Sequence, residues 1–167
     1  MISSDTTKKI HHTKNNNKKG RRKSRLEVIQ VLYKYELLNE NIEISDVFEN
    51  YEFLDRSQIQ KIDTIAKNYK TLKGFLISLL DYDWKWTRIS PVIRAILLNG
   101  ASEMFYIEPK IVINEAIEIT KSFFVPEKIY NEKDQVINEH DLKQYRFVNA
   151  ILQNYYKLLV SLENKSS

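Results

Sequence analysis

A periodic row of apolar side chains between residues 59 and 79 constrains the fold more than any other feature of the sequence. Apolar residues recur there at steps of three or four, with polar residues between them. The row consists of Ile59, Ile62, Ile65, Ala66, Tyr69, Leu72, Leu76 and Leu79. Such spacing places the apolar residues on one face of a helix. The row therefore predicts a single helix over residues 59–79 that packs one side against other helices.

Similar patterns predict further helices that begin near residues 24, 45, 91, 110 and 144. Ser90 followed by Pro91 is typical of a helix start. Gly100 falls in mid-helix, where we expect another helix to approach closely. Glycine and proline are scarce and no convincing strand pattern appears, so the charged segment 126–143 is interpreted as an irregular connection. The chain is predicted to be all-α, with six or seven helices.

The composition excludes several classes of protein. The chain has no cysteine, which rules out disulfides, thiolate catalysis and cysteine-based zinc sites. It has no apolar run of about 18 residues and no apolar signal segment, so a cytoplasmic location is expected. The three histidines, His11, His12 and His140, do not assemble a metal site. We therefore predict a protein that is not an enzyme and has neither a cofactor nor a metal.

The charge is distributed unevenly along the chain. The first 25 residues hold nine Lys/Arg and one acid, a net charge of +8, whereas the other 142 hold 17 Lys/Arg and 21 Asp/Glu, a net charge of −4. Residues 1–20 are predicted to be a disordered basic arm, and residues 21–164 a single domain. A basic arm indicates a polyanionic partner, most often nucleic acid, although a solvated solubility tail has the same composition.

Four cations stand where this arm meets the first helix. They are Arg21, Arg22, Lys23 and Arg25. The helix dipole disfavours cations at a helix N-terminus, so these side chains are expected to require a compensating anion, most simply phosphate. Trp84 and Trp86 are interpreted as packing anchors, with a stacking platform for nucleic-acid bases as the alternative.

Four stretches resemble the NusB family of transcription antitermination factors. They are "RRKSRLEVIQVLYKYELLNEN", "RISPVIRAILLNGASEMFY", "EPKIVINEAIEITKSF" and "KQYRFVNAILQNY". They occur in the family's order and cover most of residues 21–157. Two departures are Ala150, where the family has glycine, and the segment before Tyr145, which is longer and more charged than the family's loop.

The resemblance implies a compact fold of two three-helix bundles. It implies binding to boxA-type RNA of nascent ribosomal RNA transcripts, together with the ribosomal protein NusE. It also implies assembly with other Nus factors on RNA polymerase. Some members of the family form homodimers, so self-association stays open for this chain.

The resemblance also assigns roles to particular residues. The RNA-binding residues that it implies are Arg21, Arg22, Lys23, Arg25, Arg146 and Phe147. For the partner-binding surface, Tyr33 matches a motif residue, while Glu36 and Arg94 are placed there by position alone. Two alternatives remain at this point. One is an accessory protein for ribosomal RNA processing or methylation, and the other is a structural, self-associating helical protein.

Overall fold

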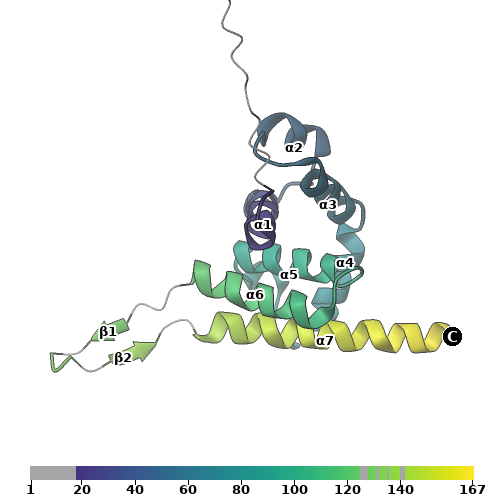
Figure 1. Cartoon of the computed structure of the whole chain (residues 1–167). Coiled ribbons are helices and arrows are strands. Elements are labelled where there is room, and N and C mark those ends of the chain that lie inside the picture. The colour runs from purple at the N-terminus through teal and green to yellow at the C-terminus, as the bar shows by residue number, and fades with distance from the viewer. Residues whose placement is uncertain (1–17, 125–127, 131, 135, 140–141) are drawn as a thin grey trace, which may run out of the picture.

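The computed structural model describes residues 18–124, 128–130, 132–134, 136–139 and 142–167 (Figure 1). The predicted basic arm, residues 1–20, lies outside these ranges except for its last three residues. The described part forms seven α-helices and one small hairpin, which confirms the predicted helical fold. No helix within these ranges is long and apolar enough to cross a membrane.

The N-terminal helix group consists of α1 (Arg21–Leu38), α2 (Ile44–Asn50) and α3 (Arg56–Lys67). α1 begins three residues before the expected start at Ser24. It ends at Asn39, whose φ of 54° lies in the left-handed region that asparagine tolerates. α3 starts with a capping box, in which the side chains of Asp55 and Gln58 each accept a hydrogen bond from the other residue's backbone N–H.

The prediction of one helix over residues 59–79 is wrong, because the chain forms two helices, α3 and α4 (Tyr69–Ser78), that meet at Asn68. Asn68 has φ −105° and ψ 9°, and its side-chain amide donates to the carbonyl of Thr64 at 2.8 Å. Asparagine interrupts helices because its side chain competes for backbone hydrogen bonds. The apolar face continues across the break, since Ile62 and Leu72 are both buried.

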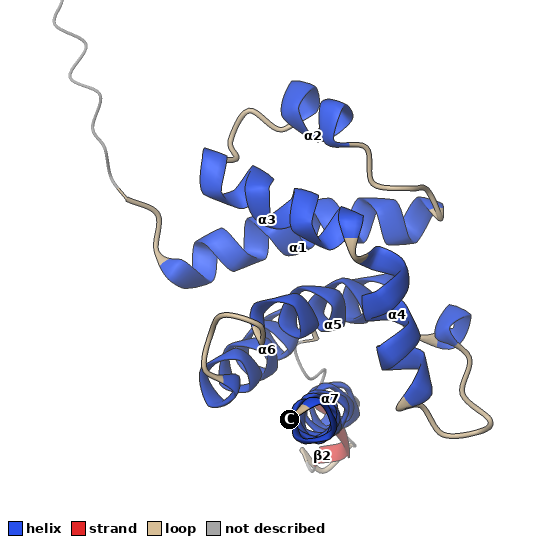
Figure 2. Ribbon diagram, turned by 90° about the vertical axis from the view of Figure 1, so that its right-hand side faces the viewer, coloured by secondary structure: helices blue, strands red, loops and turns tan. Residues whose placement is uncertain are grey.

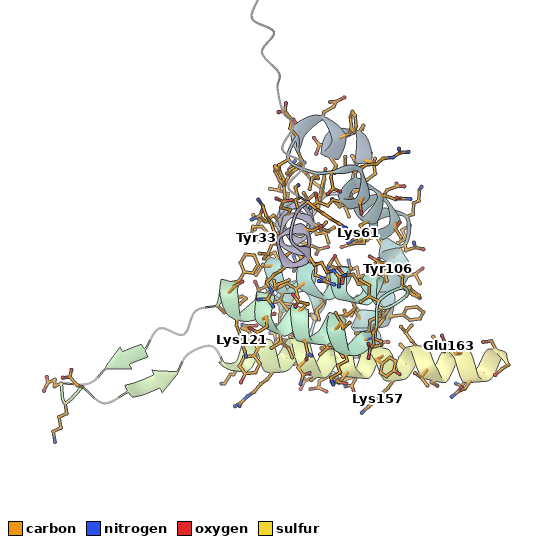
Figure 3. All side chains as sticks on the ribbon, viewed as in Figure 1. Tyr33, Lys61, Tyr106, Lys121, Lys157 and Glu163 are labelled. Atoms are coloured by element: carbon orange, nitrogen blue, oxygen red, sulfur yellow. The ribbon has the colours of Figure 1, made fainter. Side chains whose placement is uncertain are left out.

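The C-terminal helix group consists of α5 (Pro91–Glu103), α6 (Pro109–Phe123) and α7 (Leu142–Ser166), and a 3-10 helix, η1 (Trp86–Arg88), precedes α5. α5 lies at the centre, with α1 on one side and α6 and α7 on the other (Figures 1 and 2). Side chains fill the space between the helices (Figure 3), and residues 93–104 are all buried. The predicted start at Ser90 and Pro91 is confirmed, although the Ser90 hydroxyl makes no capping bond. α4 joins this group to α1–α3, which gives the two predicted three-helix groups.

α7 approaches α5 closely at Gly100. A Cβ atom built on Gly100 would lie 3.2 and 3.3 Å from the two terminal methyl carbons of Leu152, and 3.6 Å from a methyl of Val112. The predicted close approach of another helix at this glycine is therefore confirmed.

A two-stranded antiparallel hairpin separates α6 from α7 and points away from the helices (Figure 1). β1 (Lys128–Tyr130) pairs with β2 (Val136–Glu139), with Lys128 opposite Glu139 and an irregularity before Tyr130. The expectation of an irregular connection without strands is wrong for these residues. Their mixed composition did not show the strict alternation that identifies a half-buried strand.

Candidate nucleic-acid interface

Two cations of the first turns of α1, Arg22 and Arg25, and Lys19 just before the helix are matched by carboxylates of the protein itself. Their partners are Glu27 of α1, Glu103 of α5 and Glu115 of α6. The cations at the N-terminus of α1 require compensating anions because the helix dipole disfavours them there, and carboxylates of the protein supply part of this compensation. Of the four cations named from the sequence, Arg22 and Arg25 have carboxylate partners, whereas Arg21 and Lys23 form no ion pair within the described residues.

Arg25 is the most strongly engaged of these cations. Its Nε atom donates to both carboxylate oxygens of Glu103, at 3.0 and 2.9 Å. The two side chains are only 7% and 2% exposed, and the amide of Asn99 adds a hydrogen bond to Glu103 at 3.3 Å. The expectation that Arg25 faces a polyanion is wrong. Arg25 instead fixes the first turns of α1 to the end of α5.

Arg22 forms a second, more exposed link. Its Nε and Nη2 atoms donate to the two carboxylate oxygens of Glu115, at 3.0 and 3.1 Å, and more than half of the arginine side chain is exposed. The hydrogen bond from Arg22 lowers the pKa of Glu115, and the same bond raises the pKa of Arg22. Since a surface pair of this kind is weak, Arg22 can exchange Glu115 for a phosphate.

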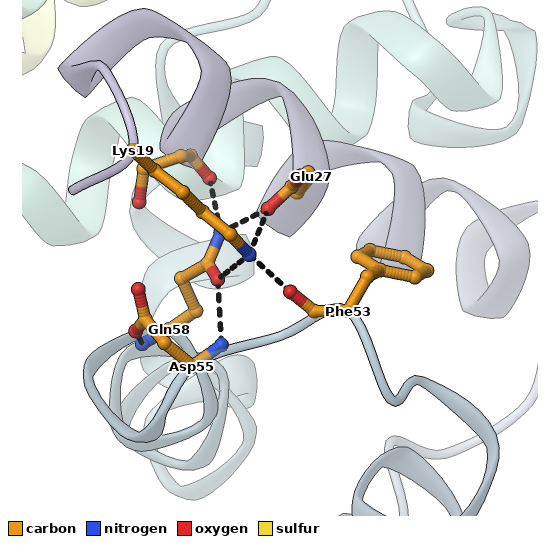
Figure 4. A network of polar contacts seen from close by, with 6 residues as sticks. Lys19, Glu27, Phe53, Asp55 and Gln58 are labelled. Carbon is orange, nitrogen blue, oxygen red and sulfur yellow. Dashed lines mark hydrogen bonds and ion pairs between the residues drawn. The ribbon is translucent and has the colours of Figure 1, made fainter. Parts of the chain in front are cut away.

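Lys19 ties the end of the basic arm to the loop before α3 (Figure 4). Its Nζ atom donates to Glu27 at 2.7 Å, to the side-chain oxygen of Gln58 at 3.0 Å and to the carbonyl of Phe53. Burial acts to raise the pKa of Glu27, but hydrogen bonds from Lys19 and Gln58 outweigh it, and the pKa is lowered overall. This cluster fixes the chain where it enters α1.

The remaining cations are Lys18, Arg21 and Lys23, which are all exposed. Within the described ranges none of them forms an ion pair. Together with Arg22 they make up what we call the basic end of α1. It is a group of four accessible cations, three on α1 and one, Lys18, just before it, and the buried Arg25 fixes the position of the helix.

Glu36 and Arg94, which were assigned to a partner surface, are buried and pair with each other. Arg94 Nε donates to Glu36 at 2.7 Å, and its Nη2 donates to the Glu36 carbonyl at 2.9 Å. Tyr69 of α4 adds a hydrogen bond to the same carboxylate, and burial together with this bond raises the pKa of Tyr69. The expectation of an exposed contact is wrong for both residues, because the pair connects α1 to α5 in the interior.

Tyr33, by contrast, is exposed on α1, above the C-terminal end of α6 (Figure 3). It borders a surface hollow of about 350 Å³, whose lining includes Pro91, Phe123 and Phe124. The hollow offers apolar and aromatic walls to a partner. The structure thus brings Tyr33 together with Phe123 and Phe124, at and just after the end of α6, which the sequence did not assign to any site.

Arg146 and Phe147 lie far from the basic end of α1, at the start of α7. Arg146 is exposed, while Phe147 is half-buried and stacks on Trp84 in the loop after α4. Figure 2 shows the N-terminal end of α1 and this loop on opposite sides of the molecule. Trp86 is buried, as a packing anchor should be, whereas Trp84 is about half exposed. The sequence-assigned RNA residues therefore divide into two separate regions.

No group of three metal-ligating side chains occurs among the residues that the structure describes. All three histidines lie outside those residues. The carboxylates of the site are used as partners for arginine and lysine. The exposed cations of the basic end of α1 are groups that can bind the phosphates of an extended anion.

Comparison with known proteins identifies relatives along most of the chain. The transcription antitermination protein NusB of Staphylococcus carnosus is 27% identical over 141 residues, which cover 81% of this chain and 98% of that protein. NusB of Dictyoglomus thermophilum is 28% identical over 139 residues, which cover 81% and 83%. These relatives agree with the prediction of a protein that is not an enzyme.

Two solved structures share the fold. NusB of T. maritima matches with a TM-score of 0.64 at 24% identity, covering 83% of this chain and 92% of the other. A chain from the crystal structure of a plectonemic RNA supercoil matches with a TM-score of 0.61 at 21% identity, covering 84% and 96%. The NusB family model matches residues 22–130, from the basic end of α1 to the first strand of the hairpin. The chain therefore belongs to the NusB family.

Proposed function

We propose that this protein is a transcription antitermination factor. It binds single-stranded boxA-type RNA of nascent ribosomal RNA transcripts in the cytoplasm, together with NusE and other Nus factors on RNA polymerase. The observation that carries the proposal is the basic end of α1, in which exposed cations stand on a helix anchored by a buried ion pair. The relatives named as transcription antitermination proteins support the same conclusion.

Four cations can meet four phosphates if Arg22 releases Glu115. On single-stranded nucleic acid each neutralised phosphate contributes about −0.7 to the slope of log K against log salt, so a slope near −3 is expected. Phosphate contacts of this kind position the RNA, and contacts to its bases select the sequence. Affinity should therefore depend on salt for every RNA, with an additional preference for the boxA type.

The hollow beside Tyr33 is the surface that we assign to NusE. Its apolar, aromatic lining is the type of surface that forms the centre of a protein interface. The buried pair of Glu36 and Arg94 holds α1, which carries Tyr33, against α5. These two residues thus serve the partner surface indirectly, through the packing of the helices.

A binding titration tests the RNA part of the proposal. Fluorescence anisotropy of a labelled boxA-type RNA and of a scrambled RNA is measured over a series of salt concentrations. The variant Arg21→Ala/Lys23→Ala removes two cations from the basic end of α1. Its salt slope should be shallower by about 1.4, which corresponds to two lost phosphate contacts.

The matched control is Lys70→Ala/Lys157→Ala, which removes the same charge from exposed positions on α4 and α7. This control should bind RNA like the wild type. Equal loss of RNA affinity in both variants would mean that affinity depends on the net charge of the protein and not on the basic end of α1. Equal affinity for boxA-type and scrambled RNA would contradict antitermination through boxA and favour the accessory role in ribosomal RNA processing.

A second titration tests the partner. Wild-type protein should bind boxA-type RNA more tightly when purified NusE from the same source is present. Tyr33→Ala should reduce this synergy while RNA affinity without NusE stays unchanged. The control is Tyr156→Ala, which removes a tyrosine of similar exposure from a different helix, α7, and should leave the synergy intact. Synergy unaffected by Tyr33→Ala would exclude the hollow as the contact for NusE.

A further inference from the structure

The surface around α2 is acidic. Residues 39–55, which we call the α2 lobe, hold six Asp/Glu and no Lys/Arg, a net charge of −6. The lobe forms the edge of the molecule farthest from α7 (Figures 1 and 2). Four of its acids are exposed and form neither an ion pair nor a side-chain hydrogen bond within the described ranges, namely Glu40, Glu43, Glu49 and Glu52. This edge therefore attracts a cationic segment and repels RNA.

Aromatic side chains lie among these carboxylates. Phe48 on α2 is 71% exposed, and Phe53 in the loop before α3 is 47% exposed. Lys34 shows what such surroundings bind, since its Nζ atom lies 3.2 Å from a carboxylate oxygen of Asp46 and 5.6 Å from the ring centroid of Tyr51. Carboxylates and ring faces both attract ammonium groups. The exposed part of the lobe thus offers the same two kinds of group to further lysines.

The basic arm of the same chain enters beside this lobe. Lys19, in the last part of the arm, already donates a hydrogen bond to the carbonyl of Phe53 (Figure 4). The residues before it include one acid, Asp5, and the lysines Lys8, Lys9, Lys14 and Lys18. An extended chain spans roughly 3.3 Å per residue, so residues 1–17 can reach about 56 Å, whereas α2 is only about 10 Å long. The arm is therefore long enough to continue the Lys19 contact across the whole lobe.

We propose that residues 1–17 dock on the α2 lobe of their own chain, with lysine ammonium groups against Glu49 and Glu52 and over the ring of Phe48. Attachment beside the lobe gives the arm an effective concentration of about millimolar, which favours this contact over the arm of another copy. Contacts between exposed charges are weak and screened by salt, so the arm docks at low salt and is released at high salt.

Docking goes beyond the proposed function, because the contact forms without RNA. Its consequence for RNA is that the arm lysines at positions 8, 9 and 14 are withheld from phosphates. RNA is then held by the basic end of α1 alone. The α2 lobe thus limits binding that depends only on the charge of the arm.

A nitroxide label tests the contact in the full chain, because the sequence has no cysteine that would compete for the label. In the variant Thr7→Cys, the attached nitroxide should broaden the NMR amide signals of α2 more than those of α7 at low salt. The difference should disappear at about 0.5 M salt, where the screening length falls to roughly 4 Å. Equal broadening of α2 and α7 at low salt, or no broadening of α2, would overturn the proposal.

Matched variants separate the lobe from the overall charge. Glu49→Gln/Glu52→Gln removes two carboxylates from the lobe and should abolish most of the broadening of α2. Asp81→Asn/Asp83→Asn removes the same charge from the exposed loop after α4 and should leave the broadening intact. Equal effects of the two variants would overturn docking at these carboxylates.

The other occupant to be tested is the arm of a second copy. Isotope-labelled protein without nitroxide is mixed with nitroxide-carrying protein of natural isotope content. Signals of α2 should stay sharp in this mixture. Broadening of α2 there would overturn docking within one chain.

RNA titration provides the last measurement. Glu49→Gln/Glu52→Gln should free three arm lysines and steepen the slope of log K against log salt by up to about 2, from about −0.7 per phosphate, whereas Asp81→Asn/Asp83→Asn should change it little. An unchanged slope in the lobe variant would overturn the withholding of the arm. Absent broadening of α2 with boxA preference intact would overturn docking and leave the proposed function standing. Broadening of α2 without boxA preference would support docking and overturn the proposed function.

Discussion

Replacing Arg25 with methionine is expected to destabilise the folded protein strongly and to leave its RNA affinity almost unchanged. In the wild type, Arg25 Nε donates to both oxygens of Glu103, and neither side chain is accessible to solvent to any useful extent. Methionine retains the length and the apolar contacts of the arginine stem. It leaves Glu103 buried, with the amide of Asn99 at 3.3 Å as its remaining side-chain hydrogen-bond donor.

The expected magnitude follows from this burial. Removing one partner of a buried ion pair costs about 3–5 kcal/mol, because the other charge stays without compensation. For a domain of this size, each kcal/mol corresponds to roughly 2–4 °C in Tm, so Tm should fall by about 6–20 °C. The contact between Arg25 Nη1 and Glu115, at 4.0 Å, adds little to this loss, since Glu115 is partly exposed.

Urea unfolding followed by circular dichroism measures the change in free energy. The control is the double variant Arg25→Met/Glu103→Met, which replaces both charges with apolar side chains and should recover most of the lost stability. RNA affinity is compared at a temperature where every variant is folded. The reasoning is refuted if Arg25→Met is as stable as the wild type. It is also refuted if its RNA affinity falls as far as that of Arg21→Ala.

Two further predictions concern packing and pH. Gly100→Ala should destabilise by up to about 2 kcal/mol in urea unfolding, since overpacking costs roughly 1–3 kcal/mol and outweighs the helix gain of about 1 kcal/mol. Gly74→Ala, where nothing lies within 4 Å of the new Cβ, should instead stabilise by about 0.5–1 kcal/mol. Because the folded pKa of Glu115 lies below its ordinary value near 4.5, its contribution is present above that value and is lost as pH falls through the folded pKa. Glu115→Gln should therefore lose less stability than the wild type between about pH 5 and pH 3, whereas Glu118→Gln, at an exposed surface pair, should follow the wild type.

Helical periodicity was sufficient to predict most of the fold, and it failed where local chemistry competed with it. The pattern from Ile59 to Leu79 correctly identified a buried face, because burial sets the spacing of apolar residues. It could not identify the break at Asn68, since that depends on one side-chain bond to Thr64. The approach at Gly100 was predictable because a glycine inside a helix usually has a packing reason.

The candidate site was only partly predictable from the sequence. The exposure of Arg21 and Lys23 could be expected from their charge alone, but the partner of Arg25 lies 78 residues away. A signal for its burial was present, since Arg25 and Glu36 stand in helical register with the buried Leu32. A charged residue on an apolar face indicates a buried ion pair more often than an exposed contact.

The two buried ion pairs explain how α1 finds one register against α5. α1 carries Arg25 and, 11 residues later, Glu36; α5 carries Arg94 and, nine residues later, Glu103. At a rise of 1.5 Å per residue these spacings are about 17 and 14 Å, so antiparallel helices bring both opposite charges together. A parallel arrangement would place like charges together, and a shift of one turn, about 5 Å, would leave all four charges buried and unpaired. The pairs thus contribute more to the choice of register than to net stability. That register places the basic end of α1 beside Glu115 of α6 and leaves its other cations exposed to solvent.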